Sequence, residues 1–353
     1  MTPTAHKRAS RLWLLFILWM AGFATANAEG GFGRALRRFD QWLEKSQRAG
    51  IDTTYQDVPK LNRQVYIGTY NYWQNYKMTM PFDVDNLASI IPGIRDNDRY
   101  TINAHAVQAE VDLGIDWKGL ALELPIPIRN RYRLSLGLAK NGSVWGMRVR
   151  YKRLHQMDGH CNVGDQSINE NNTLRIFYLE GYYVLNSRKF SLSAGLYADM
   201  VQKKSAGSVL FYANYYQSRY RVDKLFPADN DVFKTQEVSL GAGYAYNLAI
   251  RGGKLVIHGS LVPMFTAFSH LHHVTDIEPD SYDEKWKEFY DSALNGNARF
   301  SLNIFARFAM NYSFDRYLLT FLVHYRHYGY KNDKNLRILN QEADAQVNFG
   351  VRF

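Results

Sequence analysis

The sequence predicts an all-β fold: a transmembrane antiparallel β-barrel of about 12 strands with a short N-terminal amphipathic helix. Three observations predict it: apolar and polar residues alternate in many segments, an export signal precedes them, and short turns alternate with long connections. Aromatic residues make up 15% of the chain, as expected if Tyr and Trp form girdles at two membrane interfaces. A soluble all-β protein rich in Tyr is the alternative that composition alone leaves open.

The last segment, residues 340–353, alternates without a slip. Its odd positions carry apolar side chains from residue 343 onward, and its even positions carry almost only polar ones, so the two faces of the strand differ. In an outer-membrane barrel the apolar face contacts lipid and the polar face lines the lumen. A terminal Phe on such a strand is typical of the signal that the barrel-assembly machinery reads. We therefore assign that role to Phe353 and expect this machinery as a partner.

The N-terminus has the pattern of a secretory signal peptide over residues 1–28. Three basic residues between positions 7 and 11 precede an apolar run over residues 12–24, and an A-x-A cleavage site follows at residues 26–28. We expect cleavage there, export, and a location in a Gram-negative outer membrane; an uncleaved anchor is the alternative. No apolar run reaches the roughly 20 residues of a membrane-spanning helix.

Residues 29–60 form a separate periplasmic piece, and residues 61–353 form the barrel. Apolar residues recur at helical spacing among arginines and lysines over residues 34–48, which predicts a short amphipathic helix that ends at Gly50. This helix could lie on the inner leaflet, plug the barrel mouth or cap its periplasmic end. The sequence leaves these three arrangements open.

Strands follow one another from residue 63 to the C-terminus. Trp145, Met147 and Val149, for example, alternate with Arg148 and Arg150. The preceding turn at residues 141–142 is Asn-Gly, a strong signal for a hairpin. We expect strands over residues 63–78, 101–117, 120–128, 131–139, 143–155, 173–186, 189–222, 235–250, 254–270, 298–313, 316–330 and 340–353.

The connections between these strands predict the topology. Short turns near residues 118, 141, 187, 251 and 315 alternate with long connections, which matches the short periplasmic turns and long external loops of outer-membrane barrels. This pattern predicts an even strand number with both chain ends on the periplasmic side. Segment 189–222 is too long for one tilted strand of about 9–11 residues. We expect a kink that turns Gln202–Ser208 into the lumen; a second hairpin is the alternative.

Two motifs carry a resemblance to a known family. The first is Gly50-Ile51-Asp52-Thr53-Thr54-Tyr55, ahead of the first strand. The second runs from Gly181-Tyr182-Tyr183-Val184 through Arg188-Lys189-Phe190-Ser191 to Gln202-Lys203-Lys204-Ser205-Ala206-Gly207-Ser208. Over about residues 50–353 the chain resembles a Bacteroidota outer-membrane barrel family known only as a domain of unknown function, number four-four-two-one. The resemblance implies a barrel in the outer membrane and supplies no activity and no catalytic residues.

The lumen is the best candidate site, because the alternation directs rows of charged side chains into it. Opposite charges there could pair across the interior and close it, or line a narrow polar path. The lumen and constriction candidates are Arg131, Arg133, Arg148, Arg150, Lys152, Lys203, Lys204, Ser205, Arg299, Arg307, Glu110, Asp112, Glu342 and Asp344.

One pair of residues resembles the nucleophile and base of outer-membrane lipid hydrolases. His258 and Ser260 are spaced as H-x-S, and catalysis would need Ser260 as nucleophile, His258 as base and a polar residue to orient the histidine. The alternation places both in the lumen, away from lipid. A projection of the hairpin about Gly252 places Tyr246 and Tyr244 opposite them, with no carboxylate or Asn. Two ordinary lumen-facing polar residues explain the pattern better, and we expect no enzyme.

Three other features point to no defined site. The His270, His272 and His273 cluster could bind metal or haem, but histidines at the base of an exposed loop are commoner. The acidic stretch 276–291 lacks the residue spacing of a known calcium loop. Cys161 is the only cysteine, which excludes an intramolecular disulfide and a cysteine-based metal cluster. We therefore expect no metal and no cofactor.

The charge of the chain favours a lipid partner. The formal charge is +10, and removal of the signal peptide leaves about +7. Export argues against nucleic acid, so we expect outer-membrane lipid and lipopolysaccharide as partners. The leading hypothesis is a narrow or gated passage for a small polar or amphiphilic solute. A non-conducting structural or interaction barrel with partner-binding external loops is the second hypothesis, and an outer-membrane lipid hydrolase is the weakest.

Overall fold

The computed structural model describes residues 31–81, 99–126, 134–161, 166–167, 172–222, 231–275, 296–297, 301–331 and 336–353. The predicted signal peptide therefore lies outside the described residues. The chain forms two compact units, Met1–Ala49 and Gly50–Phe353. In the first, α2 spans Gly31–Arg48, which confirms the predicted helix. None of the helices in the described ranges combines the length and the apolarity needed to cross a membrane.

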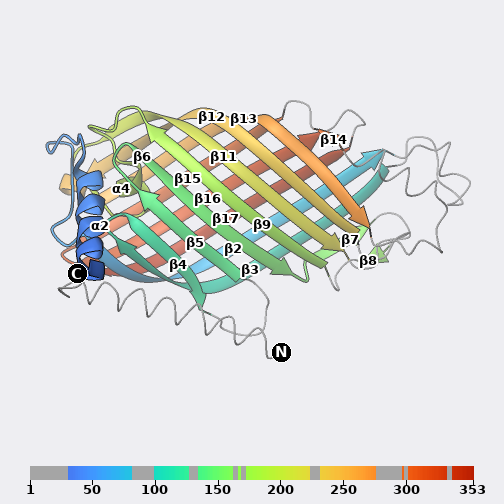
Figure 1. Cartoon of the computed structure of the whole chain (residues 1–353), viewed down its shortest axis with the longest axis horizontal. Helices are drawn as coiled ribbons and strands as arrows, with labels where there is room; N and C mark the ends of the chain where they lie inside the picture. The colour runs from blue at the N-terminus through green and yellow to red at the C-terminus, as the bar shows by residue number, and fades with distance from the viewer. Residues whose placement is uncertain are drawn as a thin grey trace, which may run out of the picture. The chain divides into compact units, whose positions relative to one another are not determined.

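The second unit is a closed antiparallel barrel of 12 strands (Figure 1). Each of these strands pairs with the next one along the chain, and the last pairs with the first, so the sheet closes on itself. The strands are β2 (Arg63–Pro81), β3 (Arg99–Trp117), β4 (Leu120–Ile126), β5 (Leu134–Asn141), β6 (Trp145–His155), β9 (Asn172–Val184), β11 (Ala206–Val222), β12 (Asp231–Ile250), β13 (Leu255–Thr275), β15 (Leu302–Phe314), β16 (Tyr317–Lys331) and β17 (Arg337–Arg352).

Short strands extend both ends of the barrel. β7 (Asp158–Cys161) pairs with β3 and with β8 (Gln166–Ser167), and β14 (Gly296–Asn297) pairs with β13. At the opposite end, β1 (Gln56–Asp57) pairs with β10 (Val201–Gln202) in a separate two-stranded sheet.

The two ends of the barrel differ in their connections. At one end, which we call the turn end, β3–β4, β5–β6, β12–β13 and β15–β16 are joined by two to four residues. The first residue of β2 and the last of β17 lie at this same end, as predicted. At the opposite end, the loop end, the connections fall largely outside the described residues. The barrel thus has the asymmetry of outer-membrane barrels.

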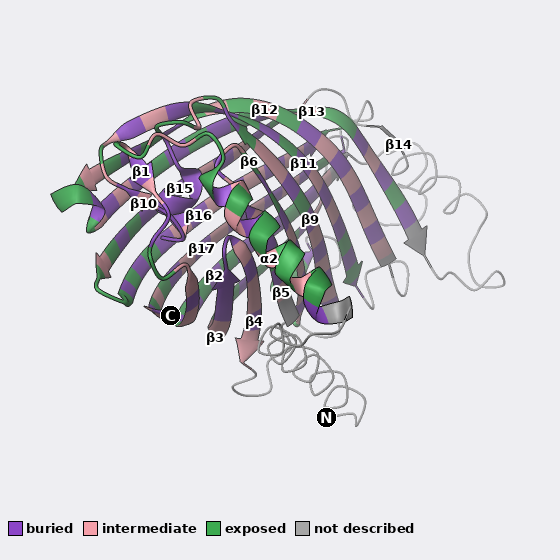
Figure 2. Cartoon of the chain, turned by 60° about the vertical axis from the view of Figure 1, so that its left-hand side comes forward, coloured by how far each residue is buried: buried purple, intermediate pink, exposed green. Residues whose placement is uncertain are grey.

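Buried and more exposed residues alternate along most of the strands (Figure 2), which indicates that successive side chains point to the lumen and to the outside. On β6, Trp145 and Met147 are about half exposed, whereas Arg150 and Lys152 are at most 2% exposed. On β17, Val347 and Phe349 face outward and Glu342 and other even residues are buried. This inside-out pattern, apolar outside and polar inside, confirms the predicted faces and is that of a membrane barrel.

The prediction of 12 strands is confirmed, but the predicted kink in 189–222 is wrong. Ala206–Val222 is one regular strand, β11, and its first residues pair with Asn247 and its neighbours on β12. The preceding residues 185–205 leave the wall and fold inside the barrel at the turn end. We call residues 185–205 the plug. Its inward part is residues 190–202 rather than Gln202–Ser208, since Phe190 to Leu196 and Ala198 to Met200 are buried.

Candidate functional site: the barrel interior

The middle of the interior is filled by buried ion pairs. Arg326 on β16 lies at their centre, and its guanidinium is 2.9 Å from Glu342 Oε1 and 3.2 Å from Glu180 Oε1. Asp344 Oδ2 lies 3.4 Å from the same group. The carboxylates come from β17 and from β9 on the far side of the barrel, so Arg326 bridges the lumen. Its side chain is only 2% exposed. A charge this deeply buried requires such partners.

Further ion pairs extend this network toward β4 and β6. Together the network joins four carboxylates to four Lys or Arg side chains, so it is close to charge balance. The additional pairs are Glu342 with Lys152, Glu123 with Arg150 at 2.6 Å and with Arg148 at 3.8 Å, and Asp344 with His324 at 2.9 Å. Of the two arrangements that the sequence left open, opposite charges that pair across the interior are the one seen in the described residues.

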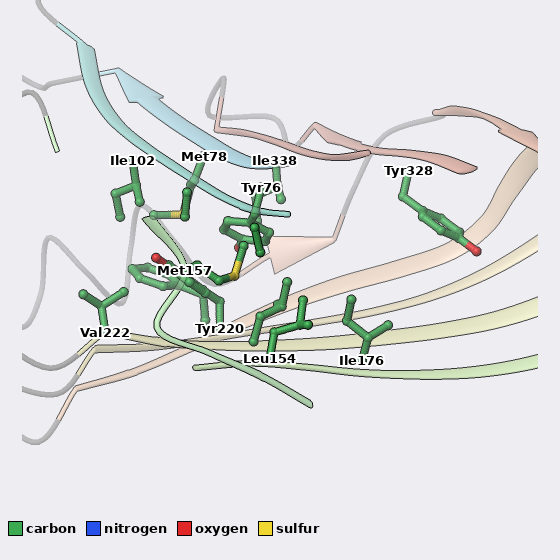
Figure 3. Close-up of a cluster of buried hydrophobic side chains, with 14 of the residues drawn as sticks. Tyr76, Met78, Ile102, Leu154, Met157, Ile176, Tyr220, Val222, Tyr328 and Ile338 are labelled. Atoms are coloured by element: carbon green, nitrogen blue, oxygen red, sulfur yellow. The ribbon is translucent and has the colours of Figure 1, made fainter. Parts of the chain in front are cut away.

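Toward the loop end, the interior is closed by tyrosines and aliphatic side chains (Figure 3). Tyr216 and Tyr328 stack with ring centroids 4.1 Å apart, and Tyr76 packs against Tyr220 at 4.7 Å. These four rings are at most 4% exposed and come from β2, β11 and β16. Because the three strands lie apart around the wall, the layer spans the lumen.

Toward the turn end, the plug fills the interior. It contains α4 (Leu192–Leu196), a short helix in which Ser191 Oγ accepts a hydrogen bond from the backbone N–H of Ala194. Every residue of α4 is buried. Phe190, Leu192 and Leu196 join an apolar cluster with inward side chains of β11, β12, β13, β15 and β16. The described interior is thus occupied in three layers: plug, ion-pair network and tyrosines.

Side chains of the wall hold the plug through its backbone carbonyls. Asn247 Nδ2 on β12 donates to Ser191 O at 2.7 Å, and Gln64 Nε2 on β2 donates to Tyr197 O at 3.1 Å. Asn311 Nδ2 on β15 donates to Gly195 O at 2.5 Å and to Ala194 O at 3.2 Å, and Arg352 Nη2 donates to Ala198 O. Each such bond contributes about 0.5–1.5 kcal/mol. The anchors come from four strands, which fixes the plug from several sides.

The two motifs that carry the family resemblance meet at the turn end. Gln56 on β1 pairs with Gln202 on β10, and the backbone N–H of Lys203 donates to Tyr55 O at 2.7 Å. Lys203 Nζ lies 2.7 Å from Asp57 Oδ2, and Lys204 Nζ lies over the Tyr55 ring at 5.4 Å from its centroid. The two motifs therefore form one packed layer at the turn end, which we call the cover and which includes the last residues of the plug.

This arrangement corrects the prediction that Lys203, Lys204 and Ser205 line a constriction. Lys204 is exposed and Lys203 is partly exposed at the cover. Ser205 Oγ accepts a hydrogen bond from the backbone N–H of Ala249 at 3.0 Å and so holds the start of β11 to β12. The prediction was wrong because it placed the inward turn at Gln202–Ser208, whereas the buried part of this connection lies earlier in the chain.

A small cavity lies beside the contact between the plug and the ion-pair network, where the Arg148 guanidinium is 4.7 Å from the Tyr197 ring centroid. Its volume is about 30 Å³, room for about one water molecule, and Tyr197, Tyr66, Glu123 and Arg148 are among its lining residues. Nearby in the plug, burial raises the pKa of Asp199 to about 6.

A second polar group lies beneath the plug, between β12 and β13. His258 Nδ1 is 2.7 Å from Asn247 Oδ1, and His258 Nε2 is 3.1 Å from Ser260 Oγ. Arg307 Nε on β15 donates to Ser260 Oγ at 3.3 Å. His258 and Ser260 face the lumen, as predicted. The predicted partners were wrong, because Asn247 and Ala245, not Tyr246 and Tyr244, pair with His258 and Ser260.

The remaining predicted residues fall into three groups. Arg148, Arg150, Lys152, Arg307, Glu342 and Asp344 point inward and are at most 8% exposed. Glu110 and Asp112 are partly buried on β3. Arg131, Arg133, Arg299 and the acidic stretch 276–291 lie outside the described residues.

The histidine cluster does not converge on a metal. His273 packs against Phe233 with ring centroids 4.8 Å apart. Within the described ranges, no group of three or more His, Cys, Asp or Glu side chains is placed to hold a metal ion.

Sequence reasoning missed five interior residues: Glu123, Glu180, His324, Arg326 and Asn247. His324 and Arg326 share the even-numbered face of β16 with buried Leu318 and Leu322, so the alternation alone could have placed them inside. The pairing across the lumen has no such local signal.

Comparisons with known proteins identify a family but no activity. The family described as Domain of unknown function (DUF4421) matches residues 51–353. No curated protein matches the chain. The outer-membrane protease OmpT of Escherichia coli is similar in structure, with 6% identity, 83% of this chain and 98% of that chain covered, and a TM-score of 0.39. The translocator domain of the Neisseria meningitidis autotransporter NalP has 10% identity, coverages of 93% and 99%, and a TM-score of 0.31. Similarities this low transfer no activity to this chain.

Proposed function

The chain belongs to the DUF4421 family, which brings no activity with it, and we propose that it works in the outer membrane as a closed, non-conducting barrel that presents its loop-end segments to partners. The observation that supports this proposal is the filled interior. A 12-strand barrel lies between the filled eight-strand barrels and the open porins, so its lumen can be either packed or open. Here three successive layers occupy it.

The ion-pair network is the layer least compatible with a conduit. An ion moving through the middle of the barrel would have to separate Arg326 from three carboxylates, or Arg150 from Glu123. Breaking a buried pair by removing one partner typically costs about 3–5 kcal/mol. A wall braced across its interior by such pairs is instead suited to a structural role.

A gated passage is the second candidate, and the plug favours it. Residues 185–205 are a connection and not part of the wall. Side-chain hydrogen bonds, apolar packing and the pairing of β10 with β1 hold them in place. Release of the plug would open the turn end of the barrel and the small cavity that Tyr197 of the plug lines. The ion-pair network and the tyrosines would then still have to rearrange.

Single-channel conductance of the refolded chain, without its predicted signal peptide, tests both candidates. In a planar bilayer we expect no discrete steps from the native chain. We also expect none when residues 190–201 are replaced by a short Gly–Ser linker, because the network still fills the lumen. Steps only in the linker variant would favour the gated passage. Conductance steps in the native chain would overturn the proposal of a closed barrel if their size changes in Arg150→Gln but not in the exposed control Arg251→Gln.

A further inference from the structure

Asn247, His258 and Ser260 form a hydrogen-bonded chain on adjacent strands. Asn247 and His258 are directly paired across the β12–β13 hairpin, and Ser260 follows two residues later on the same face. The distances of 2.7 Å and 3.1 Å join the amide to the imidazole and the imidazole to the hydroxyl. Asn247 and His258 are fully buried, and Ser260 is 9% exposed. An orienting group, a base and a nucleophile in this order are the components of a catalytic triad.

The plug determines which proton the histidine carries. Ser191 O can only accept a hydrogen bond, so the atom of Asn247 that faces it must be the NH2 group. Asn247 Oδ1 therefore faces His258 and accepts the Nδ1 proton. This tautomer leaves Nε2 with a lone pair directed at Ser260 Oγ, which is the arrangement a general base needs.

We propose that Ser260 is an acyl-accepting nucleophile for carboxylic esters with an apolar acyl chain, and that the plug keeps it covered. Ser260 Oγ attacks the ester carbonyl while its proton moves to His258 Nε2. The Arg307 guanidinium, 3.3 Å from Oγ, stabilises the negative charge that develops. The C–O bond to the alcohol then breaks, and His258 returns the proton to that alcohol. Water, activated by His258, releases the carboxylic acid and restores Ser260.

The residues around Ser260 support the choice of substrate. The plug packs on this site through Gly195, where an added Cβ would lie 2.3 Å from Asn247 Oδ1 and 2.6 Å from His258 Nδ1. Val262, Phe305 and Leu210 of the wall join Phe190 and other plug residues in one apolar cluster. When the plug moves, the space it leaves is lined by apolar wall side chains with Ser260 at its edge. An acyl chain matches that lining.

A fluorophosphonate probe in the full-length barrel tests the proposal, because it phosphonylates an activated serine with loss of fluoride. Asn311→Ala removes two hydrogen bonds to the plug and leaves the three triad residues intact. We expect labelling of Ser260, located by mass spectrometry, to be faster in this variant than in the native chain. In the same background, His258→Gln should slow labelling by about 100-fold or more, since a general base contributes that much.

Matched controls separate chemistry from exposure. Ser260→Ala should abolish labelling. Ser239→Ala changes a buried serine on the neighbouring strand β12 and should leave labelling unchanged. Asn247→Asp and Asn247→Leu both lose the donor to Ser191 O, but only Asp still accepts the Nδ1 proton. We expect labelling, with an acid limb in its pH profile, in the Asp variant and not in the Leu variant.

Two results would overturn the proposal. One is a folded Asn311→Ala barrel, with its plug cut by added protease, in which Ser260 stays unlabelled. The other is a result in which the Asn247→Asp and Asn247→Leu variants are labelled equally, or in which neither is labelled. This second test does not depend on whether Asn311→Ala releases the plug. The proposal goes beyond the closed barrel and is independent of it, since labelling reports chemistry and conductance reports passage.

Discussion

Arg326→Gln is expected to lower the free energy of unfolding by about 3–5 kcal/mol, the usual cost of removing one partner from a buried ion pair. The guanidinium contacts Glu342, Glu180 and Asp344 at 2.9, 3.2 and 3.4 Å. Glutamine can reach fewer of these oxygens and carries no charge. The cost arises from the carboxylates that remain buried.

The contacts show which carboxylate dominates this cost. Glu342 keeps Lys152, and Asp344 keeps its hydrogen bond with His324. Among the described residues, Glu180 has its closest cationic contact with Arg326 and depends on it most. A second substitution, Glu180→Gln, should therefore restore at least about half of the lost stability, because it removes the stranded charge.

Urea unfolding in lipid vesicles, followed by tryptophan fluorescence, measures these differences. Arg316→Gln at the exposed β15–β16 turn is the control and should stay within about 0.5 kcal/mol of the native chain. A cost below about 1 kcal/mol for Arg326→Gln would refute the idea that the network is tightly coupled. So would a double variant no more stable than Arg326→Gln alone.

Three further predictions concern the plug and the C-terminus. Gly195→Ala should lower stability by about 1–3 kcal/mol in the same unfolding assay, since its Cβ would overlap Asn247 and His258. Burial raises the pKa of Asp199 from 3.8 to about 6, so between these pH values the native state holds a proton that the unfolded chain releases. The free energy of unfolding should therefore fall as the pH rises from 3.8 through 6, relative to Asp199→Asn. A difference between the two chains that does not depend on pH would refute this. Phe353→Ala should leave the stability of the refolded barrel within about 0.5 kcal/mol, because the ring is 48% exposed, and should reduce the amount of barrel in the outer membrane of cells if the residue is an assembly signal.

The period-two pattern was sufficient to predict the wall of the barrel. In a strand with lipid on one face and a polar lumen on the other, apolar and polar residues must alternate. Each strand can therefore be recognised from its own sequence. The terminal strand and 143–155 were placed within three residues of β17 and β6 on this basis. Both also had the predicted faces.

The contents of the lumen could not be predicted in the same way. Arg326 and Glu180 are 146 residues apart in the sequence and meet only because β9 and β16 face each other across the closed barrel. Such a contact depends on strand number and stagger together, which no local pattern supplies. The plug was missed for a related reason: residues 190–200 are mostly apolar or small, and in a barrel sequence such a run is easily read as more wall.

One register error concealed Asn247. Folding the hairpin about Gly252 pairs His258 with Tyr246, but the connection is Arg251–Lys254 and its centre falls between Gly252 and Gly253. The alternation on β12 could have revealed this error. The projection paired Tyr246, which points outward, with His258, which points inward, although directly paired residues lie on the same face. A one-residue slip exchanges the two faces of a strand, so the facing of side chains should have overruled the turn geometry.

The same turn gives a last prediction, because it connects the register to the plug. Gly252 and Gly253 have φ values of +67° and +91°, which favour glycine at both positions. A Cβ at Gly252 would meet nothing within 4 Å, whereas one at Gly253 would lie 2.4 Å from Gln202 O in β10. Gly252→Asn should therefore cost at most about 1 kcal/mol, since Asn tolerates a left-handed φ. Gly253→Asn should cost about 1–3 kcal/mol more, because Gln202 must move. Limited proteolysis of the folded variants should cut residues 185–205 faster only in Gly253→Asn. Equal cleavage of the two would mean that the turn does not support the plug.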